Sequence, residues 1–339
     1  MHIMRQLFLL LFLGSSQLFA QVGGESIYKF LNISGSARQA ALGGNILTLV
    51  NDVNQPNWNP ATINSTIENQ LSVNYLNYLA DLNLASVAYA FKVNDKLGTF
   101  HTSINYLNYG EFIGADEEGL ETGGFKAYDL ALSIGYAYNI PNSNIFVGAN
   151  MKLVNSVIEN YSSFGIGIDL GILFNSTEVP YNLTLVVRNI GYQITVYEET
   201  KENLPTQIDF GASYKLENVP ITWFLTIDNL QKWNIAVSNP SNETTDIDGV
   251  VTKKEITFFD NAIRHFTIGA ELFSDNAFNI RLGYNFRRSK ELMLVDKRTF
   301  SGFTAGFGLK MNKLKFSYAF SKYHPASNAS TFSLLINLN

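Results

Sequence analysis

The chain has 339 residues, of which 46% are hydrophobic and only 16% are charged, against roughly 25% charged residues in an ordinary soluble domain. It has no cysteine, which excludes a disulfide framework, a thiolate metal site and a lipid-anchored N-terminal cysteine. The formal net charge of −5 argues against nucleic acid as a partner, because neutralising phosphates requires clustered Lys and Arg.

Residues 1–20 have the features of a secretory signal peptide. Arg5 precedes a short apolar run over 7–13, and small residues lead to an expected cleavage after Ala20. The run is too short to span a bilayer, which needs about 20 apolar residues, and no later stretch approaches that length. We therefore expect an exported protein without a transmembrane helix.

Residues 21–68 lack the alternation of strands and predict an N-terminal plug or hatch segment. Ser36 is the expected N-cap, and Gly43 the expected C′ residue, of a helix of under two turns. The segment is too short for a separate domain but long enough to fill a wide barrel. A strap lying beneath the barrel is the alternative. The expected plug motif consists of Ser36, Ala37, Arg38, Ala41, Leu42, Gly43, Gly44, Asn59, Pro60 and Ala61.

Residues 69–339 alternate between apolar and polar side chains. Over 278–287, every even position is large and apolar, and every odd position is polar, charged or glycine. Such a period of two places one face against apolar surroundings. Small polar residues on the opposite faces indicate that the apolar faces point outwards into lipid. Fourteen segments show the pattern: 69–80, 82–92, 97–109, 128–140, 145–158, 163–175, 182–190, 206–216, 220–229, 262–274, 277–288, 303–311, 314–323 and 330–339.

The connections between these segments alternate in length. The short ones are 93–96, 141–144, 176–181, 217–219, 275–276 and 312–313. The long ones are 110–127, 191–205, 230–261, 289–302 and 324–329, whereas the connections at Asp81 and 159–162 are short exceptions on that side. Outer-membrane barrels have short periplasmic turns and longer extracellular loops. The sequence therefore predicts an all-β fold, a closed antiparallel transmembrane β-barrel of about 14 strands with an N-terminal plug or hatch segment.

Two of the outer connections carry opposite charges. Acidic residues gather in 110–127, namely Glu111, Asp116, Glu117, Glu118 and Glu121. The connection at 289–302 and its approach form a candidate partner-docking loop with Arg287, Arg288, Lys290, Leu292, Met293, Leu294, Lys297 and Arg298. An apolar tip flanked by charge favours a docking surface. Its basic residues are equally suited to neutralising lipopolysaccharide phosphates. Asp246 and Asp248 lack the 12-residue calcium-loop pattern and favour a solvated loop.

The sequence gives little support for catalysis. No His pair has metal-ligand spacing, and no Gly-x-Ser-x-Gly elbow occurs. His101 and Ser103 share the inward face of one predicted strand, but a lumen lined with small polar residues produces such a pair by chance. We expect no enzyme activity, no metal and no cofactor.

The N-terminal motifs resemble a known family. Asn59-Pro60-Ala61 before a fourteen-strand layout is similar to the FadL superfamily, which includes the PorV barrels of type IX secretion. A second block of the sequence resembles PorQ-like barrels of the same system. It consists of Gly23-Gly24 and residues 28–32, followed by 36–38 and 40–45. The resemblance implies an outer-membrane protein of a Gram-negative bacterium, of the Bacteroidetes.

The same resemblance implies a role at the cell surface. PorQ-like barrels belong to the attachment machinery of type IX secretion, together with a PorV-like barrel, the sortase PorU and PorZ. The expected role is to anchor a PorZ-like surface protein in contact with outer-membrane lipid and lipopolysaccharide. The alternative is a FadL-like transporter of hydrophobic small molecules; a lipid-modifying enzyme using His101 and Ser103 is the weakest alternative.

Overall fold

The computed structural model describes residues 26–338 except 80, 95, 177–178, 237–242, 246–250, 254–255, 293–299 and 325–326, and only the backbone of 243–245 and 251–253. The predicted signal peptide lies outside the described residues, as does the Asp246 and Asp248 pair. Four members of the predicted docking loop also lie outside them, namely Met293, Leu294, Lys297 and Arg298.

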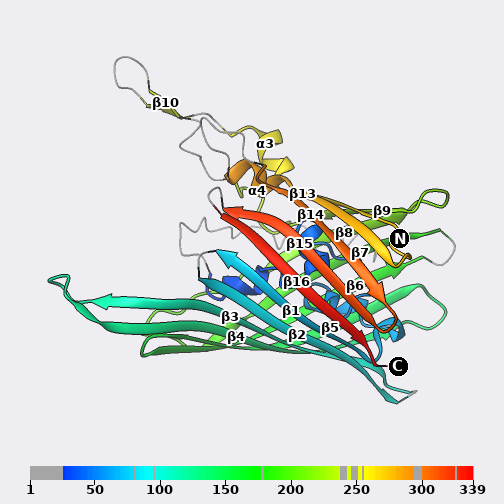
Figure 1. Ribbon diagram of the computed structural model, residues 1–339, viewed down its shortest axis with the longest axis horizontal. Coiled ribbons are helices and arrows are strands. Elements are labelled where there is room, and N and C mark those ends of the chain that lie inside the picture. Colours follow the sequence, from blue (N-terminus) through cyan, green and yellow to red (C-terminus); the bar gives the residue numbers. More distant parts are fainter. Residues whose placement is uncertain are drawn as a thin grey trace, which may run out of the picture.

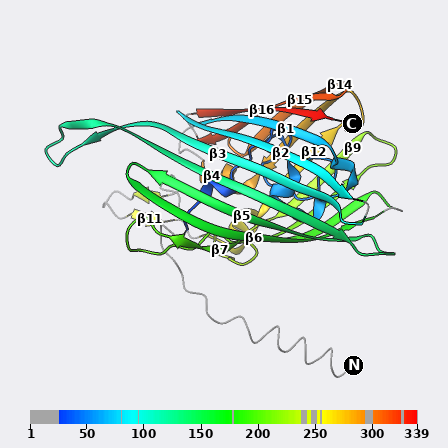
Figure 2. The same cartoon turned by 90° about the horizontal axis from the view of Figure 1, so that it is seen from below.

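Fourteen antiparallel strands form one closed barrel, which confirms the predicted fold class (Figure 1 and Figure 2). The first strand closes the ring by pairing with the last, from Gln70 opposite Asn337 to Asn77 opposite Ser330. In a closed ring, the backbone N–H and C=O groups of the strands pair with one another, because lipid offers them no hydrogen-bond partners. The strands are β1 (Gln70–Leu79), β2 (Leu82–Asn94), β3 (Gly98–Ala115), β4 (Glu121–Asn139), β5 (Ile145–Ile158), β6 (Tyr161–Asn175), β7 (Tyr181–Thr195), β8 (Gln207–Lys215), β9 (Ile221–Ile227), β12 (Phe266–Leu272), β13 (Phe278–Asn285), β14 (Phe303–Met311), β15 (Leu314–His324) and β16 (Ser327–Asn337).

The outer face of the barrel is apolar and its inner face is polar. In β13, Phe278, Ile280 and Leu282 stay 37–48% exposed on the outside. Asn279 and Arg281, which alternate with them, are fully buried inside. An apolar band around a closed barrel is stabilised by lipid rather than by water, so the barrel spans a membrane. Charged residues are scarce in the composition because the outward half of each strand faces lipid.

The short turns lie at one end of the barrel and the long connections at the other. The turns after β2, β4, β6, β8, β12 and β14 are all short, and both Gln70 and Asn337 lie at the same end. At the opposite end, the connections over 196–206, 228–265 and 286–302 are long. The end with the short turns is therefore periplasmic, and the other is extracellular.

The prediction of a long loop over 110–127 is wrong. β3 and β4 remain paired as far as Ala115 opposite Glu121, although β3 pairs with β2 only to Asn108 and β4 with β5 only to Ala127. A two-stranded hairpin therefore projects from the extracellular rim (Figure 1 and Figure 2). Beyond the rim, neither face meets lipid or lumen, so the alternation that marks barrel strands is absent. The five acidic residues expected on a loop lie on this hairpin and its turn.

Two segments that were predicted to be the ends of strands are not strand in the structure. Residues 262–265 form the end of α3 (Phe258–Ile263) and the turn after it, and 286–288 begin α4 (Phe286–Glu291). Thr257 caps α3, and Asn285 caps α4 by accepting a 2.8 Å hydrogen bond from the backbone N–H of Arg288. The connection before α3 also holds a separate hairpin of β10 (Glu243–Thr245) and β11 (Val251–Lys253). None of the described helices is long and apolar enough to cross a membrane.

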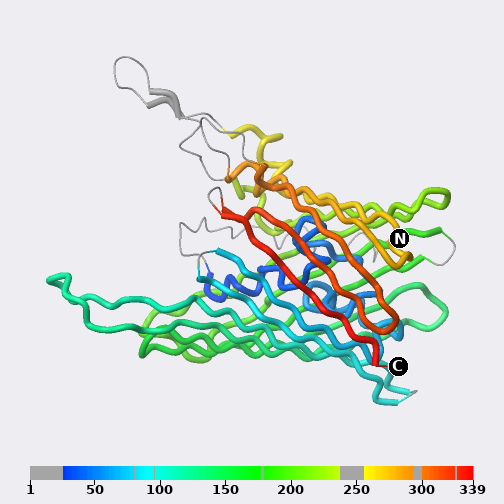
Figure 3. The backbone as a smooth tube through the Cα atoms, in the orientation of Figure 1, coloured from blue at the N-terminus to red at the C-terminus, as the bar shows by residue number. Residues whose placement is uncertain are grey.

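Residues 26–69, here called the inner segment, run inside the barrel, as the blue tube shows (Figure 3). One helix packs against β13 to β16, and a short turn of helix packs against β4 to β6. Most side chains over 27–63 are buried. The helical elements of the inner segment are η1 (Lys29–Asn32), α2 (Ala37–Ala41), η2 (Gln55–Asn57), η3 (Pro60–Thr62) and η4 (Ser65–Ile67).

Candidate functional site

The helix α2 begins with a contact to the barrel wall. Ser36 occupies the N-cap position, as expected, but its side chain makes no capping hydrogen bond. The backbone N–H of Ala37 instead donates to the hydroxyl of Ser333 on β16 at 2.8 Å. One of the unsatisfied N–H groups at a helix start is thus satisfied by the wall. The start of α2 is therefore fixed to the strand that closes the barrel.

The helix ends at the expected Gly43, in a turn that lies directly on the wall. The N–H groups of Gly43 and Gly44 donate to the carbonyls of Ala40 and Gln39, and Gly43 has a φ of +105°. This is a Schellman motif, in which glycine avoids the strain of a left-handed conformation. A Cβ on Gly283 of β13 would lie 2.3 Å from the Gly43 nitrogen. Glycine on both sides thus permits the close approach of α2 to the wall.

A buried ion-pair cluster ties the inner segment to the wall. Nη2 of Arg38 lies 2.6 Å from Oε2 of Glu271 on β12, and Nε of Arg281 on β13 lies 2.8 Å from Oε1 of the same carboxylate. Asp52 lies 3.6 Å from Arg38 on its other side. Burial alone would lower the pKa of Arg38, but the carboxylates of Glu271 and Asp52 raise it above its usual value. Arg38 therefore remains charged and bound to Glu271.

The Asn59-Pro60-Ala61 tripeptide forms a tight turn against the periplasmic half of the wall. Oδ1 of Asn59 accepts a hydrogen bond from the Ala61 N–H at 3.0 Å, and Nδ2 donates to Thr184 on β7 at 2.9 Å. A Cβ on Gly148 of β5 would lie 2.3 Å from the Pro60 carbonyl carbon. This tripeptide thus rests on wall glycines, and its asparagine joins turn and wall.

A bulge in β7 directs two consecutive side chains inwards. Asn189 has a φ of 56°, and the β6–β7 register shifts beside it, so both Arg188 and Asn189 are buried. Both donate to Oδ1 of Asn32 in the inner segment, at 3.3 and 3.1 Å. Arg188 is neutralised by Asp209 at 2.8 Å. The bulge therefore builds a second point of attachment for the inner segment.

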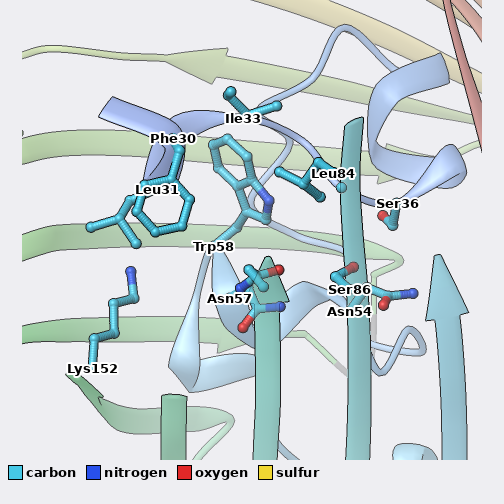
Figure 4. Close-up of a pocket in the computed structure, with 12 residues that line it drawn as sticks. Phe30, Leu31, Ile33, Ser36, Asn54, Asn57, Trp58, Leu84, Ser86 and Lys152 are labelled. Carbon is cyan, nitrogen blue, oxygen red and sulfur yellow. The ribbon is translucent and has the colours of Figure 1, made fainter. Parts of the chain in front are cut away.

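The centre of the lumen is filled by side chains. Figure 4 shows Trp58 between Phe30 and Leu84, with Lys152 below. The guanidinium of Arg188 lies 4.4 Å from the centre of the Trp58 ring. The pocket that these side chains line has only about 30 Å³ of free volume, which is space for about one water molecule. Around Trp58 the inner segment and the wall therefore leave little free volume between them.

A cavity of about 790 Å³ lies on the extracellular side of the inner segment. Its lining is largely polar, and most of its charged residues are basic. The charged lining residues are Lys29, Arg188, Asp228, Lys232, Arg287, Arg288 and Glu291.

One carboxylate in this extracellular cavity links the wall to the inner segment. Oδ2 of Asp228, just after β9, accepts a 2.6 Å hydrogen bond from Nδ2 of Asn45. Burial, and then the nearby charge of Asp209, raise the pKa of Asp228 to about 6. This contact is therefore sensitive to pH, unlike the ion pair at Arg38.

The described members of the predicted docking loop lie on α4 and at its end. Arg287 pairs with Glu291 at 2.8 Å, and Lys290 pairs with Asp260 of α3 at 3.4 Å. The guanidinium of Arg288 stacks 4.2 Å from the ring centre of Tyr323 and lines the extracellular cavity. Leu292 is the C-cap residue of α4. These basic residues are thus held at the rim, with Arg288 turned towards the lumen.

The inner segment occupies both members of the His101 and Ser103 pair. Nε2 of His101 lies 2.9 Å from the carbonyl oxygen of Val53, and Oγ of Ser103 donates to Oδ1 of Asn57 at 2.5 Å. The two side chains do not form a nucleophile–base pair. Among the described residues, no three His, Asp or Glu side chains are grouped as a metal site requires.

The family follows from the sequence itself. Residues 24–219 match the family described as type IX secretion system protein PorV. The chain belongs to the PorV family. The match covers the inner segment and the first eight strands, so it includes most of the contacts described above. PorV-family membership makes the chain a component of the type IX secretion system in the outer membrane, and agrees with a role in secretion rather than catalysis. A comparison with curated proteins finds no match.

Two solved structures share the fold. The toluene transporter TbuX of Ralstonia pickettii is 12% identical, with a TM-score of 0.50. The deltaS2 mutant of the monoaromatic hydrocarbon channel TodX is 13% identical, with a TM-score of 0.51. Each alignment covers 90% of this chain and 98% of the other chain. At such low identity these likenesses show the fold alone, which is the closed fourteen-strand barrel that the sequence predicted.

Proposed function

We propose that this PorV-family barrel is a scaffold of the cell-surface attachment machinery of type IX secretion, as PorQ-like barrels are. In this role it anchors a PorZ-like surface protein beside the sortase PorU and a PorV-like barrel. The family match supports the secretion system. The observation that carries the scaffold role is the filled lumen, because an anchor needs an outer surface and a stable wall but no passage.

The lumen argues against the transport of hydrophobic molecules. An apolar solute needs an apolar path, whereas the described lumen is lined by buried ion pairs, of Lys152 with Asp169 in the wall and of Arg38 with Glu271 between the inner segment and the wall. Displacing the inner segment to open a path breaks the second pair in a poorly solvated space, which is costly. The fold therefore favours transport, whereas the described interior argues against it.

The outer surface offers two docking features on opposite sides of the rim. In the ring of fourteen strands, β4 and β13 lie opposite each other, so the acidic β3–β4 hairpin faces away from α4. We place the partner on α4 and the residues after it, 287–298, where basic residues flank an apolar stretch in the sequence. The hairpin also exposes two apolar side chains, Ile113 and Leu120, and is therefore the second surface against which docking on α4 is compared.

Deletion of the gene tests the scaffold role. In the deletion strain, secreted cargo is expected to lose its surface attachment, and the PorZ-like protein to leave the outer-membrane fraction. Complementation with the wild-type gene restores both. Normal cargo attachment and normal retention of the PorZ-like protein in the deletion strain overturn the scaffold role and favour transport.

Paired variants test the docking site. Arg287→Ala with Lys290→Ala removes two rim cations whose salt bridges are partly exposed, so the barrel is expected to fold normally. The amount of co-purified PorZ-like partner is expected to fall about tenfold, which corresponds to about 1.4 kcal/mol. Glu117→Ala with Glu118→Ala on the hairpin is the control. Unchanged retention in the first variant, or an equal loss in the control, removes α4 as the docking site.

A further inference from the structure

A second cavity opens at the periplasmic end of the lumen, beside the inner segment. It has about 520 Å³ of free volume, within the roughly 300–1,000 Å³ of small-ligand pockets. The β14–β15 turn, the ends of β16 and β1, and the inner segment form its walls. Its charged lining residues are Arg38, Asp52, Asp275, Lys310, Lys313 and Lys315.

Three lysines lie on one side of this periplasmic cavity. Lys310 of β14 and Lys315 of β15 are direct cross-strand partners, and Lys313 lies in the turn that joins the two strands. Like charges directly opposite each other destabilise a strand pair. None of these three ammonium groups has a carboxylate within salt-bridge distance among the described residues. Among the described residues, no salt bridge offsets their mutual repulsion.

The carboxylates around the cavity are already bound to other cations. Glu271 and Asp52 lie 2.6 and 3.6 Å from the guanidinium of Arg38. Asp275 lies 2.5 Å from Nζ of Lys215. The cavity therefore has a surplus of positive charge.

Two buried guanidinium groups beside the lysines retain unused donors. Arg38 lines the cavity with only 7% of its surface exposed, and its Nε has no hydrogen-bond partner. Nη2 of the fully buried Arg281 also has none. A buried donor without an acceptor costs free energy. The charge of Arg38 adds to that of the lysines at the inner end of the cavity.

We propose that this cavity binds a phosphate-bearing ligand from the periplasm. A phosphate group brings up to about two negative charges near neutral pH, and lysine ammonium groups bind phosphate as point charges. A phosphate among Lys310, Lys313 and Lys315 offsets their mutual repulsion, which accounts for three cations in a partly enclosed space. Free phosphate and a phosphate monoester on a sugar or lipid share this chemistry.

Thermal unfolding of the full chain in a non-ionic detergent tests the proposal. Inorganic phosphate is expected to raise the Tm of the wild type above its value in chloride at the same ionic strength. Lys315→Gln is expected to weaken phosphate binding about tenfold, as loss of one close charge contact does. Without phosphate, the same variant is expected to have a higher Tm than the wild type, because the repulsion from Lys310 is gone.

Lys96→Gln is the matched control, since Lys96 is exposed in the β2–β3 turn at the same end and carries the same charge. Its phosphate affinity is expected to equal that of the wild type. Lys310→Gln repeats the test if Lys315→Gln does not fold. No phosphate effect on the wild type, or an equal effect on wild type and Lys315→Gln, overturns the proposal.

Two further ligands distinguish the sources of the phosphate. Tighter binding of glycerol 3-phosphate than of inorganic phosphate assigns the cavity to a monoester, and the reverse order assigns it to free phosphate. A triglutamate peptide that stabilises the protein more than either phosphate compound overturns the proposal, because the ligand is then an acidic peptide.

Discussion

Two buried ion-pair clusters lie in the same lumen and have different tasks. In one, Glu271 of the wall binds Arg38 of the inner segment at 2.6 Å. In the other, Lys152 of β5 binds Asp169 of β6 at 2.7 Å, and both partners belong to the wall. The strands that carry the second cluster are also joined by a ladder of backbone hydrogen bonds. The inner segment has no such ladder, so side-chain contacts hold it in place.

This difference predicts which contacts control the lumen. Breaking the wall cluster destabilises strands that remain paired, whereas breaking the segment cluster removes the buried ion pair that joins the inner segment to the wall. A buried ion pair adds little net stability compared with a well-packed apolar pair, but the loss of one partner leaves a buried charge uncompensated. The two clusters are therefore expected to have similar energies and different structural consequences.

The largest effect is expected for Glu271→Gln. This change leaves both Arg38 and Arg281 buried without their shared carboxylate, which costs about 3–5 kcal/mol of unfolding free energy. The inner segment is expected to become accessible to a protease added to the folded protein in detergent. Both the Tm and the rate of proteolysis over residues 26–69 measure the change.

The double variant Arg38→Met with Glu271→Met is its control, because it removes the carboxylate together with the cation of the inner segment and leaves only Arg281 without its partner. It is expected to recover part of the lost stability, as a double-mutant cycle detects. A Glu271→Gln protein with wild-type resistance to proteolysis contradicts the role of this ion pair as the main attachment.

Asp169→Asn tests the wall cluster and is expected to have a smaller effect. Lys152 loses its ion pair but keeps a 2.8 Å hydrogen bond to Oδ1 of Asn189, so the expected loss is about 3 kcal/mol. The Tm is expected to fall while the inner segment stays resistant to protease. Proteolysis of residues 26–69 in this variant contradicts the division of tasks between the two clusters.

The contact of Asn45 with Asp228 adds a pH dependence at the extracellular end. The pKa of Asp228 in the folded protein is about 6, against 3.8 for the ordinary group. Because the folded pKa is raised, the protonated group contributes stability that is complete below about pH 4 and is lost as the pH rises through 6. Each pKa unit corresponds to about 1.4 kcal/mol, so the expected change is of the order of 3 kcal/mol.

Asp228→Asn removes the titrating group and isolates this contribution. The Tm of the wild type is expected to fall between pH 4 and pH 7 by more than that of the variant. At pH 7, the variant is expected to be the more stable of the two, because no buried carboxylate has to ionise. Parallel Tm profiles for the two proteins contradict the assignment.

The barrel was predictable from the sequence because lipid imposes the alternation directly. Where the chain leaves the membrane, that constraint ends, and the predictions fail there. The hairpin around 110–127 has no alternation because it meets water on all sides. The alternation of apolar and polar residues continues past Asn285 into 286–288. The side chain of Asn285, however, accepts a hydrogen bond from the Arg288 N–H, and a helix begins there.

The pairing inside the lumen was only partly predictable. Glu271 and Arg281 are cross-strand partners on neighbouring strands joined by a short turn, so the sequence contained a signal for their ion pair. Arg38 is separated from Glu271 by 233 positions, and no local pattern links them. The bulge at Asn189, which turns two residues inwards, breaks the period of two and has no sequence signal apart from the asparagine itself.

The smallest expected effect concerns the start of the inner segment. The hydroxyl of Tyr28 lies 2.6 Å from Oγ of Ser163 on β6, and burial raises the pKa of Tyr28, so the hydroxyl stays protonated. Tyr28→Phe keeps the ring and removes one hydrogen bond, which costs about 1 kcal/mol. Faster amide hydrogen exchange is expected over residues 26–33, with no change near Arg38. Tyr75→Phe is the control, since its hydroxyl donates to Asn83 on the outer face. Equal exchange in Tyr28→Phe and wild type means that the ring, held against the wall by packing, fixes this end without its hydroxyl.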